Sequence, residues 1–239
     1  MREVFKTEFL KIRKRPVFII YLILPIIIFI LGETIFHPFM ERAIENLVSM
    51  GKSYSWAFIY VFLGHFGIFN NIMLPILCLR YFEIEEKNKC RNNIFTLPIK
   101  TTALYNAKIL VITLYVAANT IIMGALLTLG AITCPKINFP DYLQLFFAFG
   151  GTLLFALIYF MIVNITKNRI LFLLIFIMIF VIKGMFDRDC IFLQTWDYDV
   201  ANTHGIHITA LYYVLTPVYI IIFFILGYPA FKHTAYGKI

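Results

Sequence analysis

The sequence predicts an all-α membrane protein with six transmembrane helices and both chain termini in the cytoplasm. Three observations lead to this prediction: the composition, six long apolar stretches, and an uneven distribution of lysine and arginine. Of the 239 residues, 61% are hydrophobic and only 14% are charged. A soluble domain has roughly 45–50% apolar and about 25% charged residues, so this chain lacks the polar residues that a water-exposed surface needs. The composition therefore excludes a soluble enzyme, a disordered protein and a disulfide scaffold.

Each apolar stretch is long enough for a helix that crosses the hydrocarbon core of a bilayer, which takes about 20 residues. The fifth stretch is the shortest, and it can span where the bilayer is locally thinner. We expect these helices to form one transmembrane domain over residues 17–239. The predicted spans cover residues 17–36, 56–81, 108–133, 142–165, 170–186 and 210–231.

The positive charges predict the orientation of these spans. With the N-terminus in the cytoplasm, 16 of the 21 lysines and arginines lie on the cytoplasmic side. Cytoplasmic loops of membrane proteins collect Lys and Arg, so both termini are predicted to lie inside the cell, in a multi-pass protein of the plasma membrane. The formal net charge of +8 has the same origin. We expect no nucleic-acid binding, because no patch of interleaved basic and aromatic residues lies outside the spans.

Residues 1–16 are predicted to form an amphipathic helix on the cytoplasmic surface of the membrane. Basic residues of this segment would reach the lipid headgroups, and Pro16 would end the helix and redirect the chain. The alternative is a simple basic cluster that only sets the orientation of the first span. The apolar residues that can share one face of the helix are Val4, Phe5, Phe9 and Ile12.

Four polar side chains are predicted to lie within the second and third spans. An ionisable group inside a membrane is by default a candidate for function, whereas amides also join helices by hydrogen bonds. Two interpretations therefore stay open for these residues: they line a substrate path, or they pack helices together. The residues are His65, Asn70, Asn71 and Asn119.

Motifs for enzymatic chemistry are incomplete. The segment from Asn46 to Ser53 resembles a phosphate-binding loop but lacks its first glycine and a preceding strand, so the chain is predicted to hold no nucleotide. The Glu85-Glu86 pair, followed by Arg91, resembles the motif of CAAX-type intramembrane proteases with one residue too many in between. The cysteines lack the CxxC pairing of a zinc site. We expect a protein that is not an enzyme and that binds no metal.

The predicted cytoplasmic loop over residues 82–107 is the most informative segment. It is rich in charge and contains a candidate short helix over residues 89–96, which Pro98 would end. Ile94, Phe95 and Leu97 are apolar residues in this polar loop. Such residues usually bind in a groove of a partner protein.

The residues of this loop carry a resemblance to a known family. An acidic start at Glu83, Glu85 and Glu86, a Leu97-Pro98-Ile99 stop and a lysine at Lys108 resemble the coupling-helix region of ABC-2 type transporter permeases. The opening from Thr7 to Pro16 resembles the small permeases of lantibiotic self-protection exporters. The six-span layout with cytoplasmic ends is similar to ABC-2 type permease architecture over essentially the whole chain.

The resemblance implies a permease that works with a second permease copy or a sister subunit and with two copies of a separate ATPase. ATP and Mg would bind to that ATPase, and no cofactor to this chain. The substrate would be exported or extruded from the membrane. A cationic antimicrobial peptide would fit the acidic outer loop over residues 187–209, whereas a lipid, a drug or an ion-linked export function would fit the six spans equally well. The alternatives are a non-transport membrane assembly factor or scaffold, and the intramembrane protease. The implied ATPase-coupling residues are Glu85, Glu86, Lys89, Arg91, Ile94, Phe95, Leu97 and Pro98.

Overall fold

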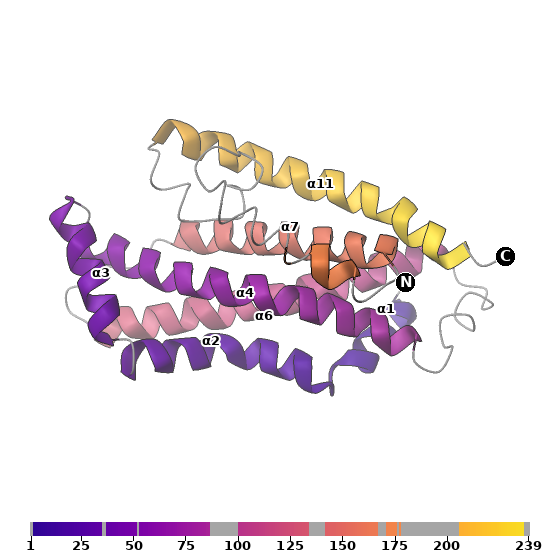
Figure 1. Cartoon of the computed structure of the whole chain (residues 1–239), viewed down its shortest axis with the longest axis horizontal. Helices are drawn as coiled ribbons and strands as arrows, with labels where there is room; N and C mark the ends of the chain where they lie inside the picture. Colours follow the sequence, from indigo (N-terminus) through magenta and orange to yellow (C-terminus); the bar gives the residue numbers. More distant parts are fainter. Residues whose placement is uncertain are drawn as a thin grey trace.

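The computed structural model is a bundle whose long helices run side by side along the long axis of the molecule (Figure 1). It describes residues 2–34, 37–51, 53–86, 100–133, 142–166, 171–175, 177 and 206–236, and these contain no strand. The all-α prediction is confirmed for this part of the chain. The helices are α1 (Arg2–Ile12), α2 (Pro16–Thr34), α3 (His37–Ser49), α4 (Tyr54–Glu86), α6 (Thr101–Thr133), α7 (Tyr142–Thr166) and α11 (Ile206–Tyr236).

The described helices account for only part of the six predicted spans. Three stretches are long and apolar enough to cross a membrane: Thr101–Ile132, Ala148–Thr166 and Leu215–His233. A fourth is added if α1 and the first part of α2 count as one bent span. Most of the predicted fifth span, over residues 170–186, lies outside the described residues. Six spans and the cytoplasmic position of both termini therefore stay predictions.

Several helices extend beyond the apolar stretches that predict them. Helix α4 continues to Glu86 and α6 begins at Thr101, so both ends of the predicted 82–107 loop are helical. Likewise, α11 begins at Ile206, inside the predicted outer loop over residues 187–209. The physical reason is that apolarity marks the part of a helix that lies in hydrocarbon, whereas the backbone hydrogen bonds continue into the polar regions beyond it.

Helix α1 is the predicted N-terminal amphipathic helix, but its apolar face packs against protein. Ile12 is fully buried, and Phe5 and Phe9 pack against the same core cluster, which includes Tyr115 of α6. The rings of Phe9 and Tyr115 lie 6.2 Å apart between centroids. Most of that apolar face therefore lies on the helical bundle, and the position of this segment at the cytoplasmic surface of the membrane stays a prediction.

The chain turns sharply where α1 gives way to α2. The two helices are bent by 78°. Pro16 is the first residue of α2, where its missing N–H leaves no hydrogen bond unmade. The carbonyl oxygen of Arg15 accepts hydrogen bonds from the backbone N–H groups of Phe18 and Ile19, at 3.1 and 3.3 Å. The predicted break at Pro16 is confirmed, and it directs α2 along the bundle.

Candidate functional site

A buried carboxylate at Glu8 lies at the centre of the candidate site. Glu8 is only 1% exposed, although it belongs to a helix at the periphery of the bundle. One carboxylate oxygen, Oε2, accepts a hydrogen bond from the Tyr81 hydroxyl at 2.8 Å and one from Lys108 Nζ at 2.9 Å. The other, Oε1, accepts a hydrogen bond from Lys11 Nζ. The carboxylate thus joins α1 to both α4 and α6.

Lys108 is the main counter-ion of Glu8. Its side chain is 3% exposed, in contrast to the 25% exposed side chain of Lys11. Its Nζ also lies 4.8 Å from the centroid of the Tyr81 ring, within the range of a cation–π contact. A lysine this deeply buried needs a partner, because an isolated ammonium group in a medium of low polarity costs several kcal/mol.

Tyr81 belongs to a group of packed aromatic rings. Phe18 meets Tyr81 edge to face, with centroids 6.2 Å apart at 88°, and meets Tyr115 at 5.1 Å and 63°. Edge-to-face pairs of this kind are favourable beyond the area that they bury. The rings come from α2, α4 and α6, so they pack these three helices together beside Tyr81, which contacts both members of the ion pair.

The electrostatics of the cluster favour the ionised carboxylate. Burial by itself raises the pKa of Glu8, but the charges of Lys108 and Lys11 and their hydrogen bonds outweigh it, so the pKa lies below its ordinary value. At neutral pH the cluster therefore holds an ionised carboxylate between cations. Breaking such a pair is far more costly than breaking an exposed one.

The helices of the cluster have a particular place in the chain. Helix α4 ends at Glu86 and α6 begins at Thr101, so these two helices lead into and out of the predicted coupling segment. Tyr81 lies near the end of α4, and Lys108 lies about two turns into α6. Figure 1 shows α1 at the end of the bundle where α4 stops. The cluster therefore joins α1 to the two helices that border residues 87–99.

The structure describes only some of the predicted coupling residues. Glu85 and Glu86 belong to the last turn of α4, and their side chains are not described. For the remainder, the predicted role in coupling is neither supported nor contradicted, because they lie outside the described residues. These are Lys89, Arg91, Ile94, Phe95, Leu97 and Pro98.

The polar residues predicted within the spans differ from one another. Asn119 is fully buried, and its amide donates a hydrogen bond to the backbone carbonyl of Tyr21, which joins α6 to α2. This contact favours the packing interpretation for Asn119. Asn70 is 2% exposed and its amide has no hydrogen-bond partner among the described residues. The side chains of His65 and Asn71 are not described, so both interpretations stay open for them.

Sequence reasoning missed Glu8 and Tyr81. A signal for Glu8 was present, because it lies four residues before Ile12 and one residue before Phe9, within the apolar face of α1. An acidic residue on an otherwise apolar face needs a buried partner. Lys108 was singled out only as the residue that closes the loop. Among the described residues, no group of three or more His, Cys, Asp or Glu side chains is arranged to hold a metal ion.

Long apolar helices of this kind define a multi-pass helical membrane protein. The chain belongs to the ABC-2 family of transporter proteins, whose family model matches residues 4–187. It is therefore a membrane component of a transport system. The matched region includes Glu8, Tyr81 and Lys108, and it ends before α11. Neither the curated proteins nor the solved structures contain a significant match to the chain.

Proposed function

We propose that the chain is the permease subunit of an ABC-2 type exporter in the plasma membrane, driven by ATP hydrolysis on a separate ATPase subunit. The observation that carries the proposal is the buried cluster of Glu8, Lys108 and Tyr81, which joins α1 to the two helices that border the segment over residues 87–99. The family assignment supports transport over the two alternatives, the non-transport scaffold and the intramembrane protease.

The coupling segment is the part that meets the ATPase in this proposal. Four residues of the segment dock into a groove of the ATPase, and this apolar contact holds the segment on the ATPase. They are Ile94, Phe95, Leu97 and Pro98. Closure of the ATPase on ATP then moves the segment, because the two nucleotide states bind it differently. The charged residues that orient the segment are Glu85, Glu86, Lys89 and Arg91.

The cluster passes that movement to the bundle. Because Glu8 contacts both Tyr81 and Lys108, the end of α4 and the start of α6 move with α1 as one body. A rigid-body shift of packed helices is a common way in which a small displacement at one end opens a path at the other. The complete transporter contains two ATPase copies and a second permease subunit, which is either a second copy of this chain or a sister chain.

A cationic antimicrobial peptide is our proposed substrate class. The segment over residues 187–209 is rich in aspartate, and a negative surface attracts a cationic peptide. Such a peptide would enter from the membrane and leave on the outer side.

The experiment that tests the proposal is co-purification of the full chain, in a mild detergent, with the ATPase subunits of its own cell. We expect one ATPase to be recovered with the chain and to be lost on Phe95→Asp. The matched control is Asn93→Asp, which adds the same charge two residues away and should retain the ATPase. Recovery of no ATPase with the well-folded chain, or equal recovery with both variants, would contradict the proposal.

A further inference from the structure

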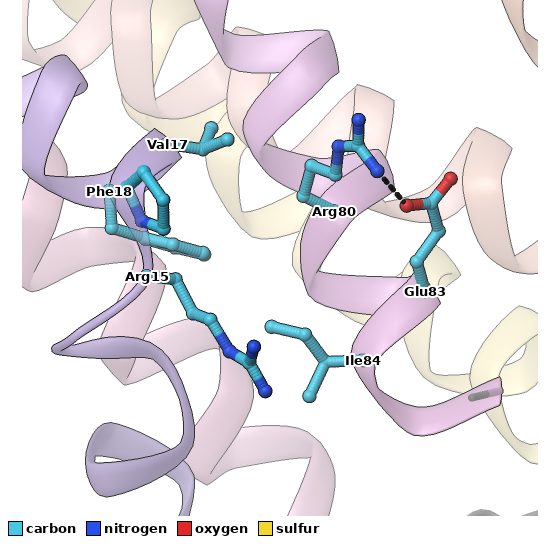
Figure 2. A pocket seen from close by; sticks show the side chains of 7 residues that line it. Arg15, Val17, Phe18, Arg80, Glu83 and Ile84 are labelled. Carbon is cyan, nitrogen blue, oxygen red and sulfur yellow. Dashed lines mark hydrogen bonds and ion pairs between the residues drawn. The ribbon is translucent and has the colours of Figure 1, made fainter. Parts of the chain in front are cut away.

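A cavity of about 330 Å³ opens beside the bend between α1 and α2 (Figure 2). Arg15 and Phe18 line it from the bend, and Arg80, Glu83 and Ile84 line it from the last turns of α4. Sites for small ligands occupy about 300–1,000 Å³, so this volume is sufficient for a small polar group. The cavity is separate from the Glu8 cluster, whose ionic groups do not line it.

The cavity carries a net positive charge. Two guanidinium groups and one carboxylate line it. Arg80 Nη1 donates a hydrogen bond to Glu83 Oε2 at 2.6 Å, and the Arg80 side chain remains 58% exposed. Figure 2 shows Arg15 and Arg80 on opposite sides of the space. The N-terminal end of α2 also borders the cavity and adds a partial positive charge.

The position of the cavity along α2 places it at the level of the lipid headgroups. Arg15 directly precedes α2, and the exposed apolar surface of that helix begins one turn later, at Ile19 and Ile20, which are 43% and 46% exposed. Exposed isoleucines face hydrocarbon, and an arginine next to them reaches the headgroup layer. A phosphate at this level would have its acyl chains beside the apolar face of α2.

We propose that this cavity binds the phosphate group of an anionic lipid, with Arg15 as the principal donor and Arg80 as the second. The planar guanidinium group matches the geometry of a phosphate and donates two parallel hydrogen bonds to it. The apolar side chains of Phe18 and Ile84 line the same space and suit the glycerol end of a lipid. The proposal requires only that the chain lies in a membrane, so it stands apart from the proposed transport mechanism.

A bound lipid would join the α1–α2 bend to the end of α4 from the membrane side. Arg15 belongs to the bend and Arg80 belongs to α4, so a phosphate held by both is a bridge between them. The lipid would therefore steady the same end of α4 that the Glu8 cluster holds from inside the bundle.

The test measures binding of phosphatidylglycerol to the full chain in a neutral detergent at 0.15 M salt. The comparison lipid without net charge is phosphatidylcholine, whose anionic phosphate is balanced by a quaternary ammonium group, and inorganic phosphate is the free-anion comparison. We expect phosphatidylglycerol alone to raise the temperature of unfolding. Arg15→Gln should weaken its binding about fivefold, the effect of one basic residue close to an anionic headgroup.

Two further variants separate a built site from general surface charge. Lys14→Gln removes the same charge from an exposed neighbour that does not line the cavity. It should weaken binding less than Arg15→Gln does, because Lys14 does not line the cavity that holds the phosphate. Glu83→Gln should strengthen binding, because it frees Arg80 to pair with the phosphate. A misfolded variant would not bind more tightly.

Four results would overturn the proposal. Phosphatidylcholine could stabilise the chain as much as phosphatidylglycerol does, or Lys14→Gln could weaken phosphatidylglycerol binding as much as Arg15→Gln does. Glu83→Gln could bind phosphatidylglycerol more weakly than the unchanged chain does. Finally, inorganic phosphate could stabilise the chain as much as the lipid does. The last result would assign the cavity to a free anion instead.

Discussion

Replacing Lys108 by methionine should destabilise the folded chain by about 2–4 kcal/mol. Methionine has a similar length and no charge, so the change removes one ammonium group from the Glu8 carboxylate at 2.9 Å with little loss of volume. The carboxylate then stays buried without its main counter-ion. The variant removes the charge of one side chain, and with it both the ion pair with Glu8 and the cation–π contact with Tyr81.

The magnitude follows from the burial of both groups. Their side chains are 3% and 2% exposed, so water does not screen the lost interaction. Removing one partner of a buried pair costs about 3–5 kcal/mol. Lys11 still bonds to the carboxylate, and its partial exposure lets it offset some of that cost. Lys11→Met is the matched control, and as a more exposed pair it should cost only about 1 kcal/mol or less.

The assay is the free energy of unfolding of the purified chain in mixed micelles, titrated with a denaturing detergent. The double variant Glu8→Leu with Lys108→Met should recover most of the stability lost in the single variant, because apolar residues can replace a buried ion pair at little cost. If Lys108→Met costs no more than Lys11→Met, or if the double variant is worse than either single variant, the reasoning from a buried pair is wrong.

Three other predictions concern separate parts of the bundle. The folded-state pKa of Glu8 lies below the ordinary value of 4.5, so the ionised carboxylate stabilises the fold fully above that pH, and this stabilisation is lost as the pH falls through the folded-state pKa. Unfolding midpoints measured from pH 3 to 7 should show this loss of stability. The Glu8→Gln variant should not show it. Gly227→Ala places a Cβ 2.5 Å from the Tyr105 hydroxyl, which donates a hydrogen bond to the Phe224 carbonyl at 2.7 Å. The variant should therefore lose about 1–3 kcal/mol of stability in the same unfolding assay, and less in a Tyr105→Phe background, which lacks the hydroxyl. Equal losses in both backgrounds would contradict the clash. With the other three cysteines replaced by serine, buried Cys78 should resist a maleimide reagent until the chain unfolds, and rapid labelling of the folded chain would place it at a surface.

The sequence predicted the features that depend on local chemistry. Long apolar runs predicted helices that the structure describes at α2, α4, α6, α7 and α11, and Pro16 predicted the break before α2. It missed α3, which buries Met40 and Ile44 against the bundle. The four-residue spacing of these two residues was a readable signal of an amphipathic helix.

The candidate site was less accessible to sequence reasoning. Glu8 and Lys108 are 100 positions apart, and nothing in the local sequence of either residue identifies the other. Lys108 follows a polar segment, so its charge indicates a loop end rather than a buried counter-ion. Only the packing of α1 across α4 and α6 brings the two together.

The distance in sequence between Glu8 and Lys108 also sets an order of events during synthesis. The ribosome releases α1 first. At that time Lys11 has been synthesised and Lys108 has not, so Glu8 has only one of its two ionic partners. Burying the carboxylate then would be costly, so α1 has to wait at the aqueous boundary until the third predicted span is made. Docking of α1 therefore marks the completion of the first half of the chain.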